Sequence, residues 1–136
     1  MMLPFVTPLK RIPTPKGDVL HGIKATDSGF EGFGEAYFTH IHHQETKGWK
    51  RHNRMTLNLI CPYGKIKVTV RDEKNIVLEA LLSPDQAETY QRLTVPPGYF
   101  VAFTGLAKGD SLLLNVASIM HDKNEADTVP LNYFDP

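Results

Sequence analysis

Two side chains suited to proton transfer lie close together in the segment GWKRHNRMTLNLICPYGKIKV, residues 48–68, where Lys50 and His52 are two positions apart. Residues two apart lie on the same face of an extended strand. An imidazole has an unperturbed pKa of about 6.5. It can therefore take a proton from a carbon beside a carbonyl. A neighbouring ammonium can stabilise the resulting enolate or, with its pKa lowered by burial, act as a base itself. The pair indicates general-base chemistry; a solvated strand end is the alternative.

Further basic side chains surround this pair, in a run made of Lys47, Lys50, Arg51 and Arg54. Alternation along a strand predicts that Arg54 lies on the same side as Lys50 and His52. Because a diphosphate is usually bound by such cations, Lys47 and Arg54 are candidate phosphate contacts. A solvated charged face is the alternative interpretation.

Three other candidates lie near or beyond the basic run. Trp49 is a candidate for stacking on a sugar or base, although strand aromatics more often belong to the core. In HIHHQ, residues 40–44, a His-x-His pair without further ligands makes a weak metal site, so His42 is considered as a ligand contact. Asn115 lies in the apolar run LLLNVAS, where a buried amide either bonds a backbone group or lines a pocket.

Composition limits the classes of partner. The chain has 136 residues, 41% hydrophobic and 22% charged, with no formal net charge, so we expect one domain and no nucleic-acid partner. The lone Cys61 cannot form an internal disulfide, which favours a reducing, cytoplasmic setting. No apolar run reaches the roughly 18 residues of a membrane span, and the N-terminal segment does not have the pattern of a signal peptide. We therefore expect no membrane partner.

Short segments separated by Gly and Pro run through the chain and are typical of strands. In GKIKVTVRD, the apolar Ile66, Val68 and Val70 alternate with polar residues, so their side chains should face a core. Regularly spaced short strands predict an all-β sandwich or barrel, as one domain over residues 1–136. Only SPDQAETYQ, residues 83–91, is left open between a helical turn and a loop.

The order of the segments is itself a pattern. A basic, His-bearing strand is followed by a glycine turn, a strand ending in VRD, then VPPGYFVAF and NVASIMHDKNEADTVPL. Over about residues 10–132 this order resembles the cupin jelly-roll proteins. It is most similar to the branch of dTDP-4-dehydrorhamnose 3,5-epimerases and dTDP-4-keto-6-deoxyglucose ketoisomerases. The resemblance implies a cupin-type double-stranded β-helix, a nucleotide-sugar ligand, and a homodimer in which an extended arm, residues 1–15, is exchanged.

Metal ligands of a general cupin lie in G-x5-H-x-H-x4-E-x6-G and in a later P-x-G-x2-H. Aligned on Gly64, the first pattern puts Lys50 and His52 at its histidines and Leu57 at its glutamate, and the second puts Val101 at its histidine. Lysine, leucine and valine supply no metal ligand at neutral pH. We therefore expect no metal here and no cofactor, which matches the metal-independent sugar-nucleotide branch.

The same resemblance implies roles for individual residues. Lys50 takes the place of the usual catalytic histidine, and His52 matches the second histidine that the ketoisomerases use. Lys47 matches an arginine that binds phosphate, and Lys16 matches an arginine that reaches the neighbouring subunit's site. A tyrosine acid near the chain end corresponds in position to His121, which is the candidate acid.

Three functions remain open on these grounds. The leading hypothesis is a dTDP-4-keto-6-deoxyhexose epimerase or ketoisomerase of cell-surface polysaccharide synthesis, with His52 as base and Lys50 as electrostatic aid. The alternative is a non-catalytic, sugar-nucleotide-binding cupin with an accessory or regulatory role, which the lysine at position 50 favours. A metal cupin built on residues 40–43 is the third and least favoured.

Overall fold

The chain folds entirely into strands and loops. The computed structural model describes residues 2–136, and no helix occurs among them. The strands are β1 (Phe5–Pro8), β2 (Arg11–Ile12), β3 (Val19–Leu20), β4 (Glu35–Ile41), β5 (Thr46–His52), β6 (Leu57–Tyr63), β7 (Ile66–Arg71), β8 (Ile76–Leu82), β9 (Gln91–Val95), β10 (Phe100–Gly105), β11 (Ser111–Ala117) and β12 (Ala126–Thr128). The predicted all-β class is confirmed.

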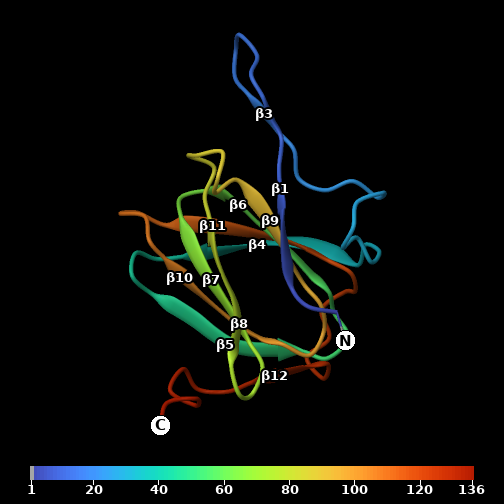
Figure 1. Cartoon of the computed structure of the whole chain (residues 1–136), viewed down its shortest axis with the longest axis vertical. Coiled ribbons are helices and arrows are strands. Elements are labelled where there is room, and N and C mark those ends of the chain that lie inside the picture. Colours follow the sequence, from blue (N-terminus) through green and yellow to red (C-terminus); the bar gives the residue numbers. More distant parts are fainter. Residues whose placement is uncertain (1) are drawn as a thin grey trace.

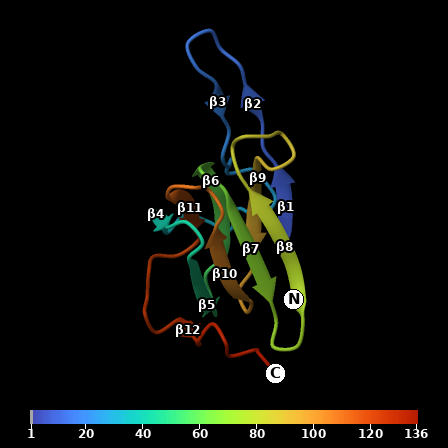
Figure 2. The ribbon, with the colours of Figure 1, turned by 90° about the vertical axis from the view of Figure 1, so that its left-hand side faces the viewer.

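Two five-stranded antiparallel sheets form the body. Their strand orders are β1-β9-β6-β11-β4 and β12-β5-β10-β7-β8, and β2 and β3 form a separate hairpin. The side view shows β4 and β5 on one side of the two layers and β1 and β8 on the other (Figure 2).

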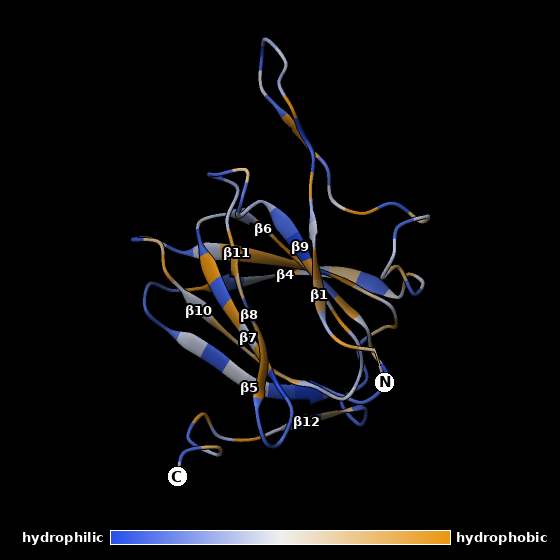
Figure 3. Cartoon of the chain, in the orientation of Figure 1, coloured by the Kyte–Doolittle hydropathy of each residue, from blue (hydrophilic) through white to orange (hydrophobic). Residues whose placement is uncertain are grey.

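Aliphatic side chains fill the half of the interior that β7, β8 and β9 enclose. Ile66, Val68 and Val70 on β7 are fully buried, as their alternation predicts. Leu82 on β8 and Leu93 on β9 are also fully buried. Hydropathy colouring shows β5 as a largely hydrophilic strand, in contrast to β8 and β11 (Figure 3). The polar strand that carries the candidate residues therefore borders the other half of the interior.

Residues 83–90 form bends and turns and not a helix, and Gln91 is the first residue of β9. The hydroxyl of Ser83 accepts a hydrogen bond from the backbone N–H of Asp85, at 3.2 Å. The carbonyl of Gln86 then accepts the N–H groups of Thr89 and Tyr90, at 3.2 and 2.9 Å. After these turns the chain enters β9.

The N-terminal segment pairs within its own chain. β1 lies antiparallel to β9, and the β2–β3 hairpin extends away from the body (Figure 1). Lys16 lies between β2 and β3, exposed to solvent. Exchange of the arm with a second subunit stays a prediction, and Met1, the first residue of that arm, lies outside the described residues.

Within residues 2–136, no helix has the length and apolar character needed to cross a membrane.

Candidate active site

An internal cavity of about 140 Å³ lies between the two sheets on the β4 and β5 side. Strands β4, β6 and β11 form one wall, and β5 and β10 form the other. Its polar lining is Tyr37, Thr39, Lys50, His52 and Asn115, and its apolar lining is Leu57, Leu59, Val101, Phe103 and Leu113. The predicted residues Lys50, His52 and Asn115 are therefore brought together, and Lys50 and His52 face the same cavity.

His52 is held in place by a buried carboxylate. His52 is 7% exposed, and its Nδ1 is hydrogen-bonded to Oε1 of Glu125, which is 3% exposed. The other carboxylate oxygen accepts the backbone N–H groups of Asn53, Arg54 and Met55, at 3.1, 3.0 and 3.3 Å. An ionised carboxylate only accepts hydrogen bonds, so the neutral imidazole carries its proton on Nδ1. Nε2 is then free to act as a base.

The environment of Glu125 favours its charged form. Burial alone would raise the pKa of this carboxyl, but the hydrogen bond from His52 and those from the Arg54 and Met55 amides outweigh burial. The pKa of Glu125 is therefore held below its ordinary value. The carboxylate stays ionised and can stabilise an imidazolium at His52.

We expect this carboxylate to make folding sensitive to acid. Because its pKa is lower in the folded than in the unfolded chain, its stabilisation is fully present above the unfolded pKa, about 4.3, and is lost as pH falls through the folded value. Between about pH 6 and about pH 3, the free energy of unfolding measured with urea should fall more steeply in the parent protein than in Glu125→Gln. Equal slopes in the two proteins would contradict this.

β5 presents two lysines on its inner face because it contains an irregularity. Lys50 lies opposite Val101 and Lys47 opposite Phe103, with a register shift between the two pairs, and both β10 residues line the cavity. A Cβ at Gly48 would lie 2.6 Å from a side-chain carbon of β10, so this close approach requires glycine. Lys47 is exposed and stands on the cavity side of the strand, further towards its start.

The opposite wall holds a network of polar groups. The Asn115 side-chain oxygen accepts the backbone N–H of Asn58 at 3.0 Å, and its amide nitrogen donates to the Tyr37 hydroxyl at 2.9 Å. Both alternatives for Asn115 are thus realised, since it bonds a backbone group and also lines the cavity. Burial raises the pKa of Tyr37, and the Asn115 bond only partly offsets this.

The alternation predicted for Arg54 is wrong. β5 ends at His52, and the chain turns where the Glu125 carboxylate binds three consecutive amides, so strand periodicity no longer applies to Arg54. Its guanidinium pairs with Asp122 at 3.0 Å on the surface. A phosphate contact by Arg54 stays a prediction, and Arg54 would make it from a position outside the internal cavity.

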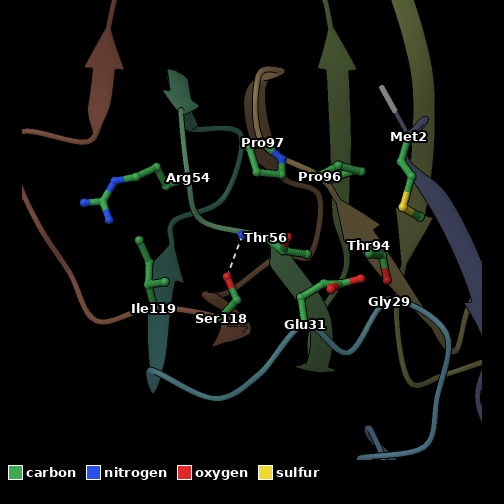
Figure 4. A pocket seen from close by; sticks show the side chains of 10 residues that line it. All are labelled: Met2, Gly29, Glu31, Arg54, Thr56, Thr94, Pro96, Pro97, Ser118 and Ile119. Atoms are coloured by element: carbon green, nitrogen blue, oxygen red, sulfur yellow. Dashed lines mark hydrogen bonds between the residues drawn. The ribbon is translucent and has the colours of Figure 1, made fainter.

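Arg54 borders a larger hollow, of about 560 Å³, on the outer side of the β6 sheet. Figure 4 shows Thr56 and Ser118 at its floor, joined by a bond from the Thr56 amide to the Ser118 hydroxyl, with Glu31 and the two prolines of the VPPG segment around it. Thr56 precedes Leu57, which faces the internal cavity, so the two hollows lie on opposite sides of this strand. The outer hollow contains no histidine.

Trp49 lies on the outer face of β5, away from the cavity. Its indole N–H donates to the carbonyl of Leu131 at 3.1 Å, and its ring forms a T-shaped pair with the ring of Phe134, with 5.5 Å between the centroids. The C-terminal segment therefore covers this side chain. Stacking of Trp49 on a ligand inside the cavity does not fit this position.

The remaining predicted residues also lie outside the cavity. His42 is exposed, with Nδ1 at 2.6 Å from Asp110, whose other oxygen is 3.4 Å from His40. Within residues 2–136, no group of three or more His, Cys, Asp or Glu is arranged to hold a metal ion. His121 lies in an open surface hollow, exposed, with its backbone amide bonded to Glu35. Roles for His42, His121 and Lys16 stay predictions.

Two residues of the site received no catalytic role from the sequence. Glu125 is separated from His52 by 73 positions and lies in an acidic segment that otherwise gave no sign of a buried carboxylate. Tyr37 lies on β4, and aromatic residues on strands more often belong to the core than to a catalytic site.

No protein-family model matches the chain, and no curated protein matches it. Solved structures do. A dTDP sugar isomerase from Desulfovibrio desulfuricans G20 is 27% identical, with a TM-score of 0.88 over 96% of this chain and 85% of that one. The fold is that of the RmlC-like cupins.

More distant structures show the same RmlC-like cupin fold. A sugar 3,4-ketoisomerase from Thermoanaerobacterium thermosaccharolyticum, solved with TDP, is 19% identical, with a TM-score of 0.75 over 97% of this chain and 92% of that one. A 4-keto-6-deoxy sugar epimerase from Streptomyces spheroides is 11% identical, with a TM-score of 0.81 over 95% of this chain and 70% of that one. The resemblance to this branch of cupins is confirmed, and these neighbours are sugar isomerases and epimerases.

Proposed function

We propose that this RmlC-like cupin is a dTDP-sugar isomerase that moves a proton beside the ketone of a 4-keto-6-deoxyhexose, as an epimerase or a ketoisomerase. The observation that carries the proposal is the position of His52, inside the cavity, with Nδ1 held by Glu125 and Nε2 free. The neighbours support the substrate class, since one ketoisomerase was solved with TDP and a mutant of it with TDP-4-keto-6-deoxyglucose.

Lys50 and His52 would both act in the first step, the removal of a proton from carbon. Nε2 of His52 takes the proton from the carbon beside the ketone, and Glu125 stabilises the imidazolium. The Lys50 ammonium stabilises the negative charge that develops on the ketone oxygen. Lys50 is suited to this because, among residues 2–136, no carboxylate lies within ion-pair distance of its ammonium.

The cavity holds the sugar and not the whole nucleotide. Drug-sized ligands usually occupy pockets of roughly 300–1,000 Å³, whereas this cavity measures about 140 Å³. The diphosphate and base would therefore lie outside it. Lys47, exposed on the cavity side of β5, is the candidate phosphate contact.

Incubation with TDP-4-keto-6-deoxyglucose in heavy water tests the proposal. We expect deuterium at carbon next to the ketone, detected by mass spectrometry, together with an isomeric sugar. If neither forms at any enzyme concentration, the proposed activity is rejected.

A non-catalytic sugar-nucleotide-binding cupin is the second candidate. The observation that favours it is Lys50 itself, which stands where the related enzymes have their usual histidine. This function predicts that TDP binds in calorimetry while no deuterium enters the sugar. A homodimer, a cytoplasmic location and a place in cell-surface polysaccharide synthesis stay predictions under either function.

Removing the ammonium tests the role of Lys50. We expect Lys50→Met to lower kcat by about 100–1,000-fold, because a cation beside the developing enolate is lost while the base stays in place. The control is Lys74→Met, which removes an exposed lysine in the β7–β8 turn and should leave kcat unchanged. Full activity in Lys50→Met would remove Lys50 from the mechanism.

A further inference from the structure

We infer that Tyr37 is the proton donor to the sugar oxygen in this site. The inference rests on the proposed function and adds to it a catalytic group from the sheet opposite His52. Tyr37 and Asn115 lie on β4 and β11 of one sheet, whereas Lys50 and His52 lie on β5 of the other, and all four line one cavity. A sugar between the sheets would have the base on one side and the phenol on the other.

The hydrogen bonds leave the phenol proton free for a ligand. Because Oδ1 of Asn115 accepts the Asn58 backbone N–H, the Asn115 amide is oriented with Nδ2 towards Tyr37. Nδ2 donates to the Tyr37 hydroxyl oxygen, which is thereby the acceptor of this bond. Within residues 2–136, no protein acceptor takes the hydroxyl's own proton. The amide thus orients the phenol and keeps its proton available.

The protonation state agrees with a donor. Burial raises the pKa of Tyr37, and the nearby carboxylates of Glu35 and Glu125 raise it further, against the smaller opposing effect of Asn115. The phenol therefore carries its proton at neutral pH. His121, the candidate acid by position in the sequence, lies in a separate surface hollow and lines no part of this cavity.

Nε2 of His52 takes the proton from carbon, the C–H electron pair forms a C=C bond, and the carbonyl π pair moves onto oxygen. That oxygen takes the Tyr37 proton, which leaves an enediol, a phenolate and an imidazolium. In the return, the phenolate takes a hydroxyl proton from the enediol while the imidazolium returns a proton to carbon. If the phenolate takes the proton from the oxygen that it had protonated, the original ketone is restored. If it takes the proton from the hydroxyl on the neighbouring carbon, the isomeric ketone forms.

Tyr37→Phe tests the inference most directly. We expect kcat for the isomeric product to fall by about 100-fold, the lower end of general acid–base effects, with KM changed by less than about threefold. Affinity for TDP, measured by calorimetry, should stay unchanged because the nucleotide lies outside the cavity. Tyr63→Phe is the matched control, since this tyrosine is exposed on β6 and should keep full activity.

Asn115→Asp separates proton direction from packing and covers the case in which Tyr37→Phe fails to fold. The substituted carboxylate has nearly the same shape and can still accept the Asn58 amide. It would also accept the Tyr37 hydroxyl proton, which reverses the direction of that bond and removes the proton from the ligand. We expect a folded protein, with a melting temperature within a few degrees of the parent, and a similar loss of kcat.

The outcomes distinguish the two proposals. If the parent protein forms isomer and Tyr37→Phe, or Asn115→Asp where the former is unfolded, keeps kcat within about threefold, the role of Tyr37 is rejected and the proposed function stands. If the parent protein forms no isomer and takes up no deuterium, the proposed function is rejected, and this role with it.

Discussion

His52→Asn should lower kcat by about 10,000-fold, the upper end of what a positioned base contributes. The ring lies in the cavity with Nδ1 bonded to Glu125, and no other histidine lines that cavity. Asparagine can replace the donor to Glu125, so the buried carboxylate keeps a partner and the fold should survive. The measurement is the rate of deuterium uptake and of isomer formation from TDP-4-keto-6-deoxyglucose.

A matched histidine controls for general effects of the substitution. His21→Asn changes an exposed side chain that follows the projecting hairpin and lines no part of the cavity. It should leave both rates unchanged. TDP affinity should be the same in all three proteins, since the imidazole faces the sugar. Deuterium uptake by His52→Asn at the parent rate would show that another group takes the proton, with Lys50 the first to examine.

Glu125→Gln should lower kcat by about 1,000-fold while leaving the protein folded. The amide oxygen can accept the backbone N–H groups of Asn53, Arg54 and Met55, as the carboxylate does. The amide nitrogen, however, would donate to Nδ1 of His52, which moves the ring proton to Nε2. The ring would then present a donor where a base is needed.

Deuterium uptake and isomer formation, compared with the melting temperature, separate this effect from simple loss of structure. In Glu125→Gln both rates should fall while the melting temperature stays within a few degrees of the parent, because the amide keeps the backbone bonds and changes only the tautomer of His52. Asp127→Asn is the control, because its exposed carboxylate pairs with Arg51 on the neighbouring strand and does not touch His52. Unchanged kcat in Glu125→Gln would remove the carboxylate from the mechanism.

The fold class followed from patterns that act over a few residues. Alternation in β7 and the turn residues between strands identified an all-β sandwich or barrel, because a strand places successive side chains on opposite faces whatever its partners are. The same rule placed Lys50 and His52 together, since both lie within β5. It failed for Arg54 because the strand ends two residues earlier, at a carboxylate that comes from a distant segment.

The position of Lys47 shows a second limit of local rules. Simple alternation separates it from Lys50, three residues on, but the irregularity at Gly48 puts both on the inner face. That irregularity depends on how closely β5 approaches β10, which sequence spacing does not report. The general-base candidate was thus accessible from the sequence, and the arrangement of the cations around it was not.

By itself the sequence determined the strands, the all-β class and the local pair of histidine and lysine, because each depends on neighbours within one strand. Only the tertiary structure decided which groups work with that pair. Glu125 reaches His52 because β12 pairs with β5, and Tyr37 faces the same cavity because β4 pairs with β11 in the opposite sheet. Such contacts join residues far apart in the chain, and the hydrogen bonds that orient them depend on where the sheets place each strand.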